Sequence, residues 1–73
     1  MTFEVWDQSS GNLIGEFAEA NDAYNLVGGI LEEEGVAGVR SLALLVEDDQ
    51  GHTKRIANGD QLASLAQRPL AAH

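Results

Sequence analysis

Two runs of acidic residues are the first candidates for chemistry in this chain. They are Glu32-Glu33-Glu34 and Glu47-Asp48-Asp49, and His52 follows the second run closely enough to pair with Asp48 or Asp49. Paired carboxylates serve as metal ligands or as general acids and bases. Neither run has the alternating ligands and central glycine of a calcium loop. Three consecutive residues of a helix also point in three directions, so we interpret both runs as solvated charge.

The remaining residue types exclude several further kinds of site. The chain has no cysteine, which rules out disulfides and thiolate-bound metals. Its two histidines, His52 and His73, lack the spacing of a zinc site, and a single histidine without a nucleophile is not a catalytic site. Gly28-Gly29 and Gly35-x-x-Gly38 lack the Lys-Ser/Thr of a phosphate-binding loop. The sequence therefore predicts a protein that is not an enzyme and uses no metal or cofactor.

The charge balance of the chain restricts its partners. Twelve acidic residues stand against Arg40, Lys54, Arg55 and Arg68, which gives a net charge of -8. Such a field repels phosphate backbones and anionic lipid surfaces, so we expect no direct binding of nucleic acid and no membrane binding. Because no apolar leader follows Met1 and no run of about 18 apolar residues occurs, a cytoplasmic location is predicted. The excess charge is typical of a solubilising surface, of a surface that binds a basic partner, or of a protein that mimics nucleic acid.

Short segments with strand periodicity organise the chain. The most apolar of them, Ser41-Leu-Ala-Leu-Leu-Val-Glu47, is closed by an acidic turn and predicts a central strand. Strands are predicted at residues 2–7, 13–17, 40–47 and 52–56. The turn that ends at Gly11 joins the first two as a hairpin, because glycine supplies the positive φ that closes such a loop.

Two segments show the three- and four-residue spacing of amphipathic helices. The first, residues 19–34, carries its apolar stripe on one side and ends before Gly35. Gly28-Gly29 in its middle disfavours a helix. We expect the pair to allow close packing against the sheet, and the alternative is that it has no structural role. The second helix begins after Asn58 as its cap, with Gln61 three residues later, and stops before Pro69.

These elements predict one α+β domain over residues 1–68, with a frayed tail at 69–73. The order is ββαββα, with a four-stranded antiparallel sheet in the order 2-1-3-4 and both helices on one face. A β-grasp fold is the alternative, but it needs a last strand paired with the first, and Leu70–His73 is too short to provide one.

Alternation along the predicted strands places an apolar patch on the face away from the helices. Leu13 is expected on the helix side, whereas the interface residues on the outer face are Trp6, Ile14, Ala43, Leu45 and Arg55. An antiparallel sheet with one solvated face normally shows polar residues there. Exposed apolar patches mark interaction sites, and tryptophan is enriched at their centres. Three explanations stay open: burial under the C-terminal helix, sheet-to-sheet dimerisation, or contact with a different protein.

The function predicted from this patch is that of a non-enzymatic interaction module, a homodimer through the open sheet face. The alternative is a regulatory binder of the antitoxin or inhibitor type that engages a basic protein with its acidic surface. Salt separates the two, because apolar association persists in high salt and acidic-surface binding weakens.

Three sequence blocks resemble a known group of proteins. They are F-E-V-W-D-Q-S-S-G-N-L-I-G-E-F, L-A-L-L-V-E-D-D-Q-G and I-A-N-G-D-Q-L-A. In this order they resemble a group of short uncharacterised bacterial proteins, often from high-GC species. The resemblance implies a stand-alone bacterial domain and carries no activity. The hairpin and helix at the start are also similar to those of HicB-like antitoxins, which have a further strand before that helix, so the likeness is one of fold alone.

Overall fold

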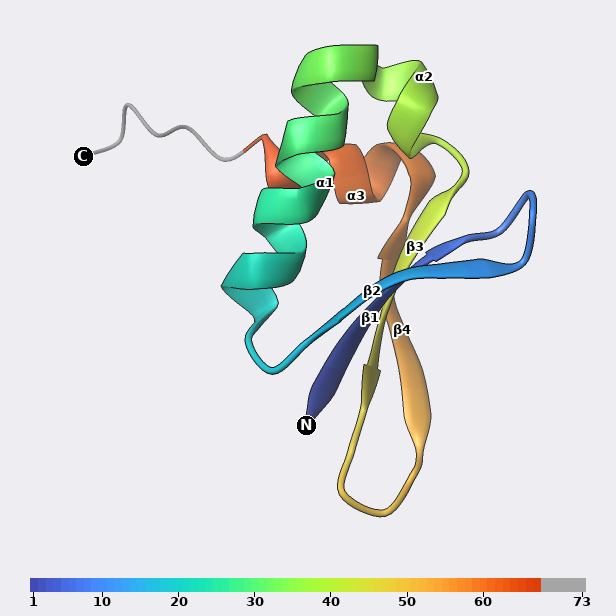
Figure 1. Ribbon diagram of the computed structural model, residues 1–73, viewed down its shortest axis with the longest axis vertical. Helices are drawn as coiled ribbons and strands as arrows, with labels where there is room; N and C mark the ends of the chain where they lie inside the picture. Colours follow the sequence, from blue (N-terminus) through green and yellow to red (C-terminus); the bar gives the residue numbers. More distant parts are fainter. Residues whose placement is uncertain (68–73) are drawn as a thin grey trace.

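The computed structural model describes residues 1–67 and confirms the predicted α+β fold (Figure 1). The elements follow the order ββαββα, with one short extra helix that the sequence analysis did not predict. They are β1 (Thr2–Asp7), β2 (Asn12–Phe17), α1 (Ala20–Glu34), α2 (Val36–Val39), β3 (Leu42–Glu47), β4 (Thr53–Asn58) and α3 (Gly59–Ala66). Arg68 and the predicted tail of residues 69–73 lie outside the described residues.

The four strands form one antiparallel sheet in the predicted order β2-β1-β3-β4. β1 pairs with β2 on one side and with β3 on the other. No later strand can therefore pair with β1, and the β-grasp alternative is excluded. The apolar segment of β3 lies between β1 and β4, as expected of a central strand.

Each hairpin turn is anchored by an aspartate. In the first turn, the Asp7 carboxylate accepts hydrogen bonds from the Ser9 hydroxyl at 2.7 Å, the Ser9 amide at 3.0 Å and the Ser10 hydroxyl at 3.0 Å. Gly11 closes this turn with a φ of 74°. The hydrogen bond from the Ser9 side chain is the main reason why the pKa of Asp7 lies below its usual value.

The second turn, between β3 and β4, has the same design. Asp48 accepts hydrogen bonds from the backbone amides of Gln50 at 2.9 Å and His52 at 2.8 Å. These bonds favour the charged carboxylate, and the one from the His52 amide contributes most to the lowered pKa of Asp48. The His52 Nδ1 atom also lies 3.2 Å from Asp48, which confirms one of the two predicted pairings of this histidine.

The core lies between the sheet and the helices, which gather on one side of it (Figure 1). Strands, α1 and α3 all contribute to a single cluster of buried residues. Its members are Val5, Ala23, Val27, Val39, Leu42, Leu44, Ala57, Leu62 and Ala63. Because α3 packs with α1 on this face, α3 does not cover the opposite face, and burial under the C-terminal helix is excluded as the explanation of the apolar patch.

α3 begins where the sequence predicts, but Asn58 does not cap it in the predicted way. The Asn58 side chain makes no capping hydrogen bond. The turn into α3 depends on Gly59 instead, which is buried with a φ of 56°. A side chain at Gly59 would also start 3.3 Å from the Arg40 carbonyl oxygen, so both conformation and space favour glycine there.

Candidate functional site

The face of the sheet opposite the helices is the candidate site. Residues directly opposite one another in neighbouring strands share a face, so the strand register defines its members. We call this surface the open face; it carries Thr2, Glu4, Trp6, Leu13, Glu16, Ala43, Leu45, Glu47, Thr53, Arg55 and Asn58. Within residues 1–67, no helix lies on it.

Trp6 is the largest side chain of the open face and is held in one orientation. It is half-buried, and its Nε1 atom donates a hydrogen bond to the Glu4 carboxylate at 2.9 Å. Glu4 is two residues away on β1 and therefore points to the same side. This bond directs the indole along β1 towards Glu4, so the ring presents an ordered apolar surface whose only donor is already used.

A β-bulge changes which residues of β2 accompany Trp6. The register is Trp6 opposite Leu13 and Val5 opposite Gly15, so Ile14 is the extra residue. Leu13 is 41% exposed and Ile14 42%, and neither packs against the core. The expectation that Leu13 faces the helices was therefore wrong. The bulge adds Leu13 to the open face beside Trp6.

The remaining residues predicted for the interface lie on β3 and β4. Leu45 is half-buried and stands opposite Arg55, which is exposed. Ala43 lies opposite Trp6, but with only 1% of its surface exposed it forms the floor of the face and offers no contact of its own. The accessible apolar part of the open face is therefore made by Trp6, Leu13 and Leu45, while the predicted interface residue Ile14 is the unpaired residue of the bulge.

Charged residues surround this apolar centre unevenly. Glu4 and Glu16 stand directly opposite one another on β1 and β2, and Glu47 lies on β3. Among residues 1–67, Arg55 is the one cation on the open face, since Lys54 pairs with Val46 on the other side and Arg40 binds Asp60 at 3.4 Å. The β2 side of the face is thus acidic and the β4 side basic.

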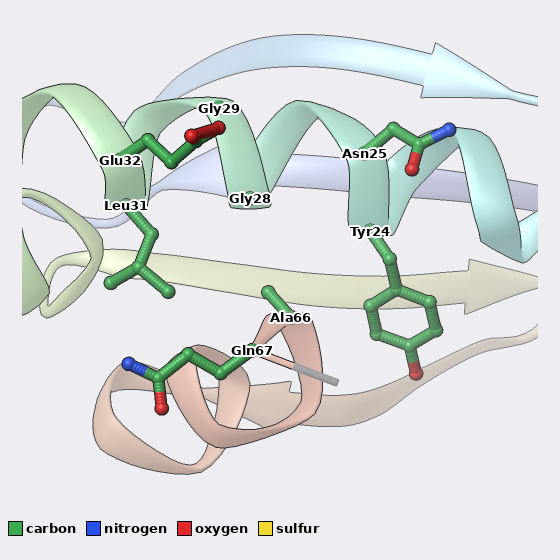
Figure 2. Close-up of a pocket in the computed structure, with 8 residues that line it drawn as sticks. All are labelled: Tyr24, Asn25, Gly28, Gly29, Leu31, Glu32, Ala66 and Gln67. Carbon is green, nitrogen blue, oxygen red and sulfur yellow. The ribbon is translucent and has the colours of Figure 1, made fainter. Parts of the chain in front are cut away.

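Apart from the open face, a groove of about 330 Å³ lies between α1 and α3 (Figure 2). Tyr24 and Leu31 extend from α1 towards α3 on either side of it, with Gly28 between them. A side chain at Gly28 would start 3.7 Å from the Ala66 carbonyl oxygen, and one at Gly29 would meet nothing within 4 Å. The glycine pair therefore does not pack against the sheet, which corrects that expectation: Gly28 faces α3.

The groove and the acidic runs bring together few groups that could act in catalysis or bind a metal. Glu32 is the one carboxylate among the eight residues that line the groove. Glu32, Glu33 and Glu34 are all exposed, in agreement with solvated charge. In the described part of the chain, no three His, Cys, Asp or Glu side chains are grouped as metal ligands would be, and none of its helices is long and apolar enough to cross a membrane.

Comparison with known proteins adds no assignment to this geometry. No protein-family model, no curated protein and no solved structure matches the chain. The resemblance to short bacterial proteins therefore stays a prediction.

Proposed function

We propose that this protein is a small, non-enzymatic interaction module that forms a homodimer through its open face. The observation that carries the proposal is the apolar centre of that face: Trp6, Leu13 and Leu45 lie together on a sheet surface that no described helix covers. Solvated faces of antiparallel sheets are normally polar, and exposed apolar patches around an aromatic residue are typical of interaction sites.

A second copy of the chain is a suitable partner because it brings the same kind of surface. Two sheets pack face to face with their inner side chains interdigitated, which is the arrangement of a β-sandwich. The open face is ordered for this role, since Trp6 is already fixed by Glu4. Less conformational entropy is then lost on association.

The size of the face indicates a small interface. Four strands of six residues cover roughly 20 Å by 20 Å, or about 400 Å² of projected area. Stable protein pairs bury about 800 Å² per partner, so this interface belongs with the smaller and weaker ones. We expect a dissociation constant on the order of micromolar, and a monomer–dimer equilibrium that dilution shifts.

Sedimentation equilibrium of the wild type and Trp6→Glu tests the proposal. We expect a concentration-dependent dimer for the wild type and a folded monomer for Trp6→Glu, because the substitution places a third carboxylate beside Glu4 and Glu16. Val36→Glu is the matched control: Val36 is 38% exposed on α2, away from the open face, so this variant should dimerise normally.

Two outcomes would contradict this function. A wild type that stays monomeric up to millimolar concentration has no self-association to explain. Dimerisation that Trp6→Glu leaves intact uses another surface. If the monomer instead binds a basic protein and added salt abolishes the binding, the acidic-surface alternative is supported, because screening weakens exposed charge pairs.

A further inference from the structure

The strand register aligns four side chains in one row across the middle of the open face. Glu16 stands opposite Glu4, Glu4 opposite Leu45, and Leu45 opposite Arg55. The row therefore runs from two carboxylates on β2 and β1, through an apolar residue on β3, to a guanidinium on β4.

The two ends of this row have no charged or hydrogen-bonding partner among the described residues. Glu16 and Arg55 are both exposed, and within residues 1–67 neither makes a salt bridge or a side-chain hydrogen bond. Glu16 instead stands opposite Glu4, and like charges in directly opposite positions are unfavourable. A cation placed over Glu4 and Glu16 from outside would remove this repulsion.

Two-fold symmetry offers two aligned ways to stack one open face on another. An axis parallel to the strands reverses the order of the strands, so that β2 of one copy lies over β4 of its partner. Each row of side chains then faces the same row of the partner, which runs in the opposite direction. An axis perpendicular to the strands places each strand over its own equivalent. In the second arrangement, acidic β2 meets acidic β2 and Arg55 meets Arg55.

We propose that the dimer axis runs parallel to the strands, so that Arg55 of each copy binds the Glu16 and Glu4 carboxylates of the other. The inference rests on the proposed function and specifies its geometry. It gives the dimer two equivalent charge pairs around a central contact between Leu45 and Trp6 side chains. The same pairs select the orientation, because the other axis leaves like charges opposed.

The distances are compatible with this pairing. Strands lie about 4.8 Å apart, which puts Glu16 and Arg55 each about 7 Å from the midline of the sheet. Because aligned sheets cross at about 30°, a residue about 7 Å from the midline is displaced by about 4 Å along the strand direction relative to the residue that faces it. Packed sheets are about 10 Å apart, a gap that the long arginine and glutamate side chains span together.

Charge exchange between the two ends of the row tests the orientation. Arg55→Glu and Glu16→Arg should each weaken dimerisation about tenfold, because each places like charges opposite one another at two symmetric positions. The double variant Glu16→Arg/Arg55→Glu keeps the wild-type net charge and should regain wild-type affinity within about threefold. Both positions are exposed, so circular dichroism should show native folding for all three variants.

Cross-linking provides an independent measurement, because the cysteine-free chain allows single thiols to be placed. With a short bis-maleimide, a mixture of Glu16→Cys and Arg55→Cys proteins should yield covalent dimers on a denaturing gel, whereas either protein alone should not. A dimer in which Glu16→Cys links to itself, with no recovery in the charge-exchanged double variant, would overturn this orientation and leave the homodimer proposal standing. A wild type without any dimer would overturn both.

Discussion

The two faces of the sheet are built from alternating residues of the same strands, yet they differ in every property that matters for recognition. Leu44 and Leu45 are neighbours on β3; Leu44 is fully buried under the helices and Leu45 is half-buried on the open face. The buried residues of the covered face are all apolar, and the described residues include no buried polar side chain without a partner. The open face combines an apolar centre with unpaired charge.

The covered face serves mainly the stability of the fold, whereas the open face is the one proposed for recognition. Burial of apolar surface on the covered face supplies most of the favourable free energy of folding that a small domain has. The open face contributes less to that free energy and is therefore available for a partner. An apolar surface outside the core is typical of an interaction site, which supports the proposed association through the open face.

The adjacent leucines give the largest expected effect. Leu44→Ala should lower the free energy of unfolding by about 2–5 kcal/mol, because it leaves a cavity in the core. Leu45→Ala, measured at a concentration where the chain is monomeric, should cost less than about 1 kcal/mol, since half-buried sites relax around the change. In sedimentation experiments Leu45→Ala should weaken dimerisation, which Leu44→Ala affects only through loss of folded protein.

Urea titrations at low and high protein concentration distinguish the two effects, because dimerisation stabilises the folded state only when the protein is concentrated. Equal destabilisation by both substitutions at low concentration would mean that Leu45 belongs to the monomer core. The difference between the two faces would then not indicate a binding surface.

The alternation of residues along β1 and β3 was enough to predict the division into faces, because side chains in a strand point alternately to each side. Val5, Leu42 and Leu44 alternate with the outer-face positions Trp6, Ala43 and Leu45, and they lie in the core. The assignment of Leu13 to the helix side was wrong, because the bulge at Ile14 shifts the register of β2 by one residue. The available signal was Gly15, since glycine inside a strand often marks a bulge; a side chain there would start 2.9 Å from the Phe17 ring.

The charged row could not be predicted from the sequence, because it depends on the registers of three strand pairs at once. Alternation shows which side of its own strand Arg55 occupies, but not that Arg55 aligns with Leu45, Glu4 and Glu16. A second bulge, at Ile56, also lies between Arg55 and the buried Ala57. Long-range pairing of this kind is a property of the folded sheet, not of any local pattern.

A substitution in α1, which covers the β1–β2 half of the sheet, should have a smaller effect on stability. Gly29 is exposed and a side chain would meet nothing there, so Gly29→Ala should raise the free energy of unfolding by about 0.5–1 kcal/mol through helix propensity. Gly35→Ala is the control, and it should destabilise because Gly35 has a φ of 75°. Urea denaturation measures both.

Gly29→Ala should leave the dimerisation constant unchanged, since it strengthens only the covered side. A change in dimer affinity with Gly29→Ala would show that the helical layer takes part in association. The assignment of binding to the open face alone would then be wrong.

The smallest effect expected is a loss of stability in acid. It depends on the turns at the ends of the sheet and not on either face. The folded-state pKa values of Asp7 and Asp48 lie below the ordinary value of 3.8, so their stabilising contribution is complete above that value and is lost as the pH falls through the lower folded-state pKa. The urea midpoint should therefore decrease below about pH 4, and Asp48→Asn should reduce that decrease by removing the titrating group.

Asp49→Asn is the matched control in the same turn, since Asp49 accepts a bond only from the exposed N-terminus among the described residues. If Asp49→Asn changes the acid response as much as Asp48→Asn, general charge repulsion and not the turn hydrogen bonds controls it, and acid then acts on the whole acidic surface, the open face included.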